Sequence, residues 1–326
     1  MPTVVAAWTK VIVDYAADHG IDVSRPDVDL SHRDLRVPLH LDQAIWQAAE
    51  RALGDDDLGI HLAESGVSAG SFGVVGYLVR ASTTVGEGLV RAQQFHRLVK
   101  DRGRLELVAT PSAATATVID APDPDQAMWS RAIAELSIAN YVQLARTWTG
   151  KPFVPREVRF QHARPGDTRE LDRFFGCKLR FGQRDNALVM SREALETPFT
   201  TSEPELGAYL ESAAAARLAQ LPAPSLLDEV RAAIGDELRR GDVDIERVAR
   251  RVGVTPRSLQ RRLRDDGTSY RELVDAIRHQ RAIDLIRRGL PFGDIAEHLG
   301  FSEARAFRRA FRRWTGLVPS AIPRPA

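Results

Sequence analysis

The sequence predicts two parts, an α/β (α+β) N-terminal domain with a mostly antiparallel sheet and an all-α C-terminal domain. At 326 residues the chain is about twice as long as a typical single domain. Helix-like and strand-like patterns are mixed before residue 200, whereas only helical patterns follow residue 225. Between them, Pro222 and Pro224 in LPAPS prevent an alanine-rich helix from continuing, so we expect the domains to separate there.

The N-terminal region carries both helical and strand-like patterns. Apolar residues at helical spacing predict helices over residues 3–19, 41–53, 85–100 and 126–148. Short alternating or β-branched stretches predict strands that begin at Leu105, Thr115, Glu157, Cys177 and Asn186. We expect residues 1–200 to form one domain, and residues 201–224 to form a helical linker.

Residues 225–326 repeat one pattern, which consists of a short helix, a turn and a second helix. The two copies cover about residues 244–265 and 292–314. One long helix over residues 270–288, ended by Gly289 and Pro291, joins them. At 1.5 Å per residue this helix spans about 28 Å, close to the ~34 Å of one turn of DNA. The pattern predicts two helix-turn-helix units that reach successive major grooves from one face of the duplex.

Turn and cap residues mark both units. In the first, Gly253 can adopt the left-handed conformation of a tight turn, and Thr255 followed by Pro256 is a favourable helix start. In the second, Gly300 and Ser302 take the same two places, the turn and the N-cap. The agreement of turns and caps indicates that the two units share one design.

The second helix of each unit separates apolar from basic side chains. Leu259 and Leu263 in the first, and Phe307, Phe311 and Trp314 in the second, are spaced to pack on one face. We assign DNA contact to the opposite face, which carries Arg257, Ser258, Gln260, Arg261, Arg264, Arg305, Arg308, Arg309 and Arg312. Arg can form paired hydrogen bonds with guanine, and Gln with adenine. The alternative is that these charged residues form an ordinary solvated surface. That would account for one such helix, but it does not explain two copies at a spacing that suits DNA.

Charge is distributed unevenly along the chain. From Leu221 to Ala326 there are 21 Arg, no Lys and 15 Asp plus Glu, which gives +6, so the first 220 residues carry 24 minus 29, or −5. A basic C-terminal region beside an acidic remainder indicates a polyanionic partner for one domain only. Double-stranded DNA is the partner that this pattern favours.

These residues resemble the DNA-binding domain of the AraC/XylS family of bacterial transcriptional regulators. The resemblance is carried by TPRSLQRRLRDDGTSYRELVDAIRHQRAIDLI and DIAEHLGFSEARAFRRAFRRWTGLVPSAI. It implies an activator that contacts RNA polymerase, and it implies that the residues facing base edges are Arg257, Gln260, Arg261, Arg305 and Arg309. Some members carry a polar base-contacting side chain where this chain has Ala304, so the second unit is expected to read fewer bases.

The N-terminal region is similar to that of the ornithine-utilisation and mycobacterial virulence regulators of this family. RALGDDDLGIHLAES, GSFGVVGYLVRASTTVGEGL and FFGCKLRFGQRDNALVMSREAL carry the resemblance, whereas the region does not resemble the family's cupin-like barrel. If a small effector binds here, we expect its pocket near Phe72, Tyr77 and Phe95, where aromatic side chains gather around a glycine-rich turn. The resemblance also implies that residues 1–200 form a regulatory domain that binds an effector or forms a homodimer.

Two other classes of function remain open. GVSAG fits the nucleophile elbow of a hydrolase, with Ser68 as nucleophile and His162 as a partner, but IHLAES before it reads as a helix where the elbow needs a strand. We therefore expect no enzyme activity. An architectural protein that binds DNA without sequence preference is the other alternative.

Other groups predict no further chemistry. Cys177, the single cysteine, is expected to be a small buried residue, and the eight histidines show no metal-binding spacing, so we expect neither a metal nor a cofactor. The longest uncharged stretch, Ser65 to Val79, is too short to span a membrane. The N-terminus lacks the basic lead of a signal peptide, and a cytoplasmic protein is expected.

Overall fold

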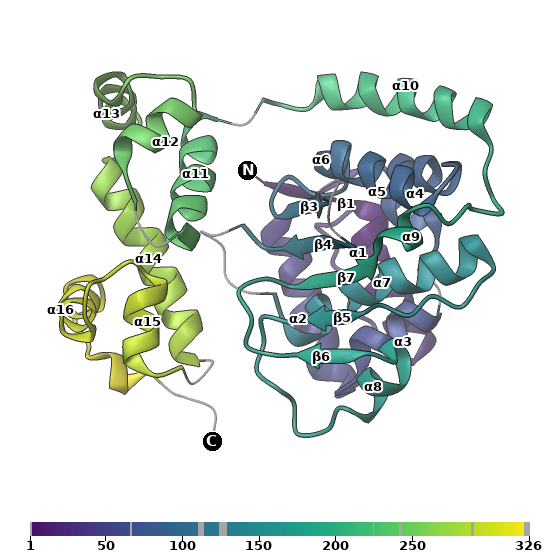
Figure 1. The fold of residues 1–326 in the computed structure, drawn as a ribbon, viewed down its shortest axis with the longest axis horizontal. Coiled ribbons are helices and arrows are strands. Elements are labelled where there is room, and N and C mark those ends of the chain that lie inside the picture. Colours follow the sequence, from purple (N-terminus) through teal and green to yellow (C-terminus); the bar gives the residue numbers. More distant parts are fainter. Residues whose placement is uncertain are drawn as a thin grey trace. The chain divides into compact units, whose positions relative to one another are not determined.

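The computed structural model describes residues 2–322 except 66, 110–113, 124–128, 224, 241–242 and 288–289. The chain forms two compact units, the first from residues 1–121 and 129–221 and the second mainly from residues 222–326 (Figure 1). The first unit mixes helices with a sheet, and the second is built from helices. The predicted combination of an α+β and an all-α region is confirmed.

A five-stranded sheet runs through the first unit in the order β3-β4-β7-β5-β6. Its strands are β3 (Arg104–Val108), β4 (Thr115–Ala121), β5 (Glu157–Arg159), β6 (Lys178–Arg180) and β7 (Ala187–Ser191). Every neighbouring pair is antiparallel except β5 and β6. All five predicted strands are therefore present. Because β3 and β6 are the edges of this sheet, it does not close into a barrel.

Helices α3 (Leu58–Ser65) and α7 (Arg131–Thr149) pack closely within the main core of this unit. A Cβ atom on Gly59 of α3 would lie 2.6 Å from the carbonyl oxygen of Ala132 on α7. Glycine is thus required at this position because the two backbones are too close for any side chain. Helix α7 ends at Gly150, which adopts the left-handed conformation with φ 64°.

Two helices predicted from the sequence are divided in the structure. The first begins as strand β1 (Thr3–Val5), which pairs with β2 (Arg36–Pro38), and continues as α1 (Ala6–Asp18). Val4 and Val5 are buried there, and β-branched side chains suit a strand. The second is broken at the buried Phe95 into α5 (Val85–Gln94) and α6 (His96–Val99). Helix α2 (Leu39–Leu53) agrees closely with its prediction, and the predicted start of α7 at residue 126 lies outside the described residues.

The first unit contains several further helices. They are η1 (Ala69–Phe72), α4 (Gly73–Arg80), α8 (Arg169–Phe175), α9 (Arg192–Leu195) and α10 (Pro204–Gln220). Helix α10 runs beside α4 and α6 (Figure 1) and buries Ala214 in a cluster with Leu78 and Phe95. Ion pairs from Arg91 to Glu211 and from Arg217 to Asp34 hold it further. The helix expected to be a linker thus packs on the first unit; of the two prolines expected to end it, Pro222 is described and Pro224 is not.

The second unit is entirely helical in its described residues. Its elements are α11 (Leu226–Arg240), α12 (Ile245–Arg251), α13 (Pro256–Asp265), α14 (Tyr270–Arg287), α15 (Phe292–His298), α16 (Ala304–Thr315) and η2 (Pro319–Ala321). The expected end of the long helix at Gly289 lies outside the described residues. Two separate hydrophobic cores hold these elements, one around α11, α12 and α13 and the other around α15 and α16. Across both units, no single described helix is long and apolar enough to cross a membrane.

Candidate DNA-binding surface

The first helix-turn-helix unit is built as the sequence predicts. Val248 on α12 and Leu259 and Leu263 on α13 are fully buried in one core. Gly253 in the turn between them has φ 70°, the left-handed conformation that a tight turn requires. The hydroxyl of Thr255 accepts a hydrogen bond from the backbone amide of Ser258 at 3.2 Å and so caps α13.

The outer face of α13 carries the polar residues that the sequence singles out. Arg257, Gln260, Arg261 and Arg264 are all exposed. Ser258 is only half-buried, and its hydroxyl accepts a hydrogen bond from the hydroxyl of Thr255 at 3.0 Å. A helix held by two buried leucines thus presents three arginines and a glutamine to solvent, which is the chemistry needed to reach base edges and phosphates.

The second unit repeats the arrangement with one difference. Ile295 and Leu299 of the α15 region and Phe307 and Phe311 of α16 are fully buried, and Gly300 in the turn has φ 69°. The predicted cap is wrong, because α16 begins one residue later than expected. Its N-cap residue is Glu303, which makes no side-chain capping hydrogen bond, and Ser302 lies outside the helix.

The outer face of α16 is strongly basic. The exposed residues are Arg305, Arg308, Arg309, Arg312 and Arg313. Arg308 lies over the ring of Phe292, 5.4 Å from its centroid, so its guanidinium is held beside α15. Arg313, which the sequence analysis did not single out, forms an ion pair with Asp275 on α14 at 2.9 Å. Ala304 packs against the second core, which explains why a small apolar residue suits this position.

Helix α14 connects the two basic helices. Its 18 residues extend about 27 Å at 1.5 Å per residue. Leu273, Val274 and Ile277 in its first half pack in the first core, whereas Ala282, Leu285 and Ile286 in its second half pack in the second. One helix therefore carries both units and sets the distance between them.

The three aromatic residues proposed for an effector pocket lie in three different environments. Phe72 packs against the main core and lies 6.0 Å from the ring of Trp8. Phe95 is 1% exposed, in the smaller cluster beneath α10, and Tyr77 is 42% exposed. Phe72 and Phe95 therefore pack in different clusters, and an effector pocket near these three residues stays a prediction.

The residues considered for a hydrolase are not arranged as a nucleophile elbow. Ser68 follows helix α3 instead of a strand, and its backbone amide donates to the hydroxyl of Ser71 at 3.1 Å. His162 stacks on Phe160, with ring centroids 4.9 Å apart. Gly66 of the GVSAG motif lies outside the described residues.

Cys177 is partly buried, and burial raises the pKa of its thiol to about 11, so it is not a thiolate at neutral pH.

A buried carboxylate that sequence reasoning missed lies between β4 and α7. Asp120 accepts hydrogen bonds from Lys100 at 3.0 Å, from Tyr141 at 2.9 Å and from Ser137. Burial alone would raise the pKa of Asp120, but the charge of Lys100 and the hydrogen bonds from Ser137 and Lys100 bring it below its ordinary value. The nearby His96 has a buried Nε2 atom without a hydrogen-bond partner, and burial lowers its pKa to about 3. It is therefore neutral at physiological pH.

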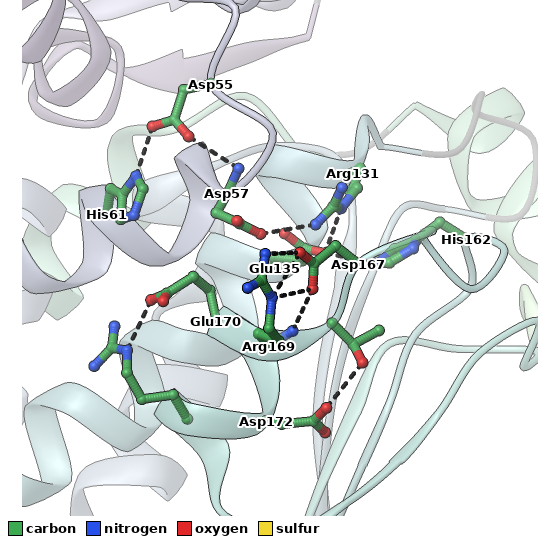
Figure 2. Close-up of polar contacts among 12 residues, drawn as sticks. Asp55, Asp57, His61, Arg131, Glu135, His162, Asp167, Arg169, Glu170 and Asp172 are labelled. Carbon is green, nitrogen blue, oxygen red and sulfur yellow. Dashed lines mark hydrogen bonds and ion pairs between the residues drawn. The ribbon is translucent and has the colours of Figure 1, made fainter.

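A second buried carboxylate, Glu135 on α7, lies near Arg131 of the same helix and near charged residues from other parts of the chain (Figure 2). Arg131 donates to it at 2.7 Å and to Asp57 at 3.0 Å, and the Nε2 atom of His162 lies 3.5 Å away. Glu135 is fully buried, and its Oε2 atom has no hydrogen-bond partner. Burial raises its pKa to about 7, although Arg131 acts in the opposite direction. No group of three or more side chains suited to hold a metal gathers in the described part of the chain.

Two helix-turn-helix units, each presenting a basic helix, define a DNA-binding protein of the helix-turn-helix class. Residues 248–324 match a family described as a helix-turn-helix domain, and residues 20–199 match one described as the N-terminal arabinose-binding domain of AraC transcription regulator. Across 96% of its length the chain is 30% identical to the ornithine utilization regulator of Pseudomonas aeruginosa, and it covers 94% of that protein. The chain belongs to the AraC family of transcription regulators, and it is a DNA-binding regulator.

A second relative agrees with this assignment. The chain is 31% identical to the HTH-type transcriptional regulator VirS of Mycobacterium tuberculosis across 57% of its own length and 54% of that protein. The crystal structure of the transcriptional regulator CdpR from Pseudomonas aeruginosa matches with 25% identity and a TM-score of 0.45, covering 96% of each chain. The sequence predicts a resemblance to the ornithine-utilisation and mycobacterial virulence regulators. The matches to the ornithine utilization regulator and to VirS confirm it.

Proposed function

We propose that this protein is an effector-responsive transcriptional activator that contacts two successive major grooves of promoter DNA. One observation carries the proposal, namely that α13 and α16 each bury an apolar face and expose a row of arginines. In helix-turn-helix proteins the second helix of each unit enters the major groove. Helix α14, at about 27 Å, is close in length to one turn of DNA, which suits two adjacent grooves.

The contacts divide into two kinds. Arg257, Gln260, Arg261, Arg305 and Arg309 would read base edges, since bidentate hydrogen bonds from Arg and Gln distinguish bases in the major groove. Contacts to phosphates would come from Arg264, Arg308 and Arg312, and Ser258 would add a hydrogen bond near the start of α13. The phosphate contacts position the protein, and the base contacts provide its specificity.

The first unit would act as the regulatory part. We infer that residues 1–200 bind a small effector or form a homodimer, and that residues 225–326 bind DNA and contact RNA polymerase. The relatives named as an ornithine utilization regulator and as the HTH-type transcriptional regulator VirS support a regulatory role for the whole chain. The protein would act in the cytoplasm, where its DNA target is found, and it would not be an enzyme.

Footprinting tests the central proposal. The full-length protein is incubated with DNA from upstream of its own gene and of neighbouring genes, and the bases protected by it are mapped. We expect two protected segments about one helical turn apart on one face of the duplex. Protection of a single short segment would contradict the two-groove arrangement.

Two further experiments test the alternatives. Competition between promoter DNA and random DNA at one fixed salt concentration should favour the promoter, whereas an architectural protein would bind both equally. A hydrolase would cleave simple esters, and the activity would be lost in Ser68→Ala. We expect no ester cleavage by the unchanged protein.

A further inference from the structure

The two helix-turn-helix units are separate in their packing. Among the described residues, no buried side chain belongs to both cores, and α14 is the one helix that contributes to each. The angle between α13 and α16 therefore depends on α14 and on any contact that crosses between the units. Packing within either core leaves this angle undetermined.

A small bend in α14 would have a measurable consequence for DNA binding. Each half of the helix is ~13 Å long, so a bend of about 15° at its centre would move one end by about 3.5 Å, roughly one base-pair step. Helices commonly curve gently with radii of ~60–100 Å, and over the length of α14 such curvature amounts to about 15° or more. Recognition of two half-sites at a fixed spacing thus requires something that keeps α14 straight.

Charged side chains from the middle of α14 make such contacts. Asp275 lies one residue beyond Val274 of the first core, yet both of its oxygens contact Nη2 of Arg313 on α16, at 3.1 and 2.9 Å. Arg278 lies one residue beyond Ile277 of the first core. Its Nε atom donates to the carbonyl oxygen of Leu299, at 3.0 Å, in the turn of the second unit.

Further contacts strengthen this connection. The guanidinium of Arg278 lies 4.8 Å from the ring centroid of Phe301, which also belongs to the second unit. Arg281 reaches in the opposite direction, since it precedes Ala282 of the second core but donates to the carbonyl oxygen of Gly235 on α11 at 3.3 Å. Each half of α14 is thus tied to the helix-turn-helix unit whose core it does not enter.

We propose that Arg278, Arg281 and the Asp275–Arg313 ion pair are positioning residues that fix the spacing at which this protein accepts two DNA half-sites. The inference rests on the proposed two-groove binding. These side chains act through the orientation of α13 and α16, and they need not touch DNA themselves. Their removal leaves both cores and all of the proposed DNA-contact residues in place but lets α14 bend, so that DNA with a changed spacing is bound almost as well as the preferred one.

The test begins with DNA that the full-length protein selects from a pool of random duplexes. Kd is then measured for the selected site, for the same site with one base pair added or removed between its halves, and for a single half-site. The variants are Arg278→Ala, Arg281→Ala, Asp275→Arg and the exchange Asp275→Arg with Arg313→Asp. Arg271→Ala is the matched control, because Arg271 is exposed in the first turn of the same helix.

We expect the unchanged protein and Arg271→Ala to prefer the selected spacing. Arg278→Ala, Arg281→Ala and Asp275→Arg should reduce this preference about two- to fivefold, the factor expected for the loss of one intramolecular hydrogen bond or one exposed ion pair. Their affinity for a single half-site should stay unchanged, and the charge exchange should restore the preference.

Two results would overturn the proposal. One is a spacing preference that is unchanged in all variants. The other is an equal loss of affinity on every DNA, which would mean that these residues support folding or bind phosphate. If the unchanged protein gains no affinity from a second half-site, the two-groove function itself fails, and this outcome is recognised without any variant.

Discussion

Thr255 and Ser258 are joined at the start of α13 by a hydrogen bond of 3.2 Å from the backbone amide of Ser258 to the side-chain oxygen of Thr255. The corresponding start of α16 has no such bond, because its N-cap residue is Glu303. The two helices that we propose to face DNA are therefore stabilised differently at their N-terminal ends. The N-terminal residues of such a helix make the base contacts, so the cap bears directly on recognition.

Thr255→Ala should destabilise α13 by about 1 kcal/mol through loss of its cap. Ser302→Ala is the matched control and should have no effect, since Ser302 does not cap α16. Hydrogen exchange followed by mass spectrometry measures the local stability of α13 and α16 in both variants. Amides of α13 should exchange about fivefold faster in Thr255→Ala than in the unchanged protein. Faster exchange of α16 in Ser302→Ala would show that this residue does cap α16.

Phe311→Ala should lower the free energy of unfolding of the second unit by about 3 to 5 kcal/mol, because it leaves a cavity in the core around α15 and α16. The neighbouring Arg312→Ala should leave stability unchanged and weaken DNA binding, since Arg312 is exposed. Thermal unfolding followed by circular dichroism separates the two effects. An unchanged Tm in Phe311→Ala would mean that the faces of α16 are assigned incorrectly.

Arg261→Ala and Arg309→Ala should each weaken binding to the selected DNA by about 1 to 3 kcal/mol and relax the choice of base at one position. Kd is measured on the selected site and on sites with single base changes, at one salt concentration. Equal weakening on all sequences would instead identify a phosphate contact. Loss of structure is excluded by circular dichroism of the same samples.

Glu135→Gln should change how stability depends on pH. Burial raises the pKa of Glu135 to about 7 in the folded protein, from an ordinary value of 4.5. The folded state therefore holds this proton more tightly than the unfolded state, and stability falls as pH rises from about 4.5 to about 7. Glutamine cannot ionise, so the variant should gain stability relative to the unchanged protein as the pH rises from about 4.5 to about 7.

Tm measured across this range checks the prediction. Glu170→Gln serves as the control, because Glu170 is an exposed partner of Arg173 on α8. If Glu135→Gln and the unchanged protein follow parallel curves, the carboxyl is ionised throughout, with its charge balanced by Arg131 and His162.

Local sequence patterns predicted the regular elements well where one face of an element is buried. Alternation in β4 agrees with the burial of Ala116 and Val118, and helical spacing in α13 agrees with the burial of Leu259 and Leu263. Glycines at the turns were also predicted correctly, because a left-handed conformation strongly favours glycine. These features depend on neighbours in the chain.

Features that depend on distant residues were missed. Strand β1 forms because it pairs with Arg36–Pro38, and nothing within residues 3–5 indicates that partner. The buried contacts of Lys100 with Asp120, and of Glu135 with His162, join residues 20 or more positions apart. A charged residue inside an apolar helical pattern, as Glu135 is in α7, was the one local sign of such a contact.

The separate cores of the second unit have a consequence for how such a regulator changes during evolution. A substitution in α13 that alters its base preference must fit the core formed with α11 and α12. It does not change the core around α15 and α16. In the two-groove binding that we propose, one half of the target sequence can therefore diverge while the other half is kept. A promoter could pass from one regulator to a descendant of it through intermediates that still bind half of the old site.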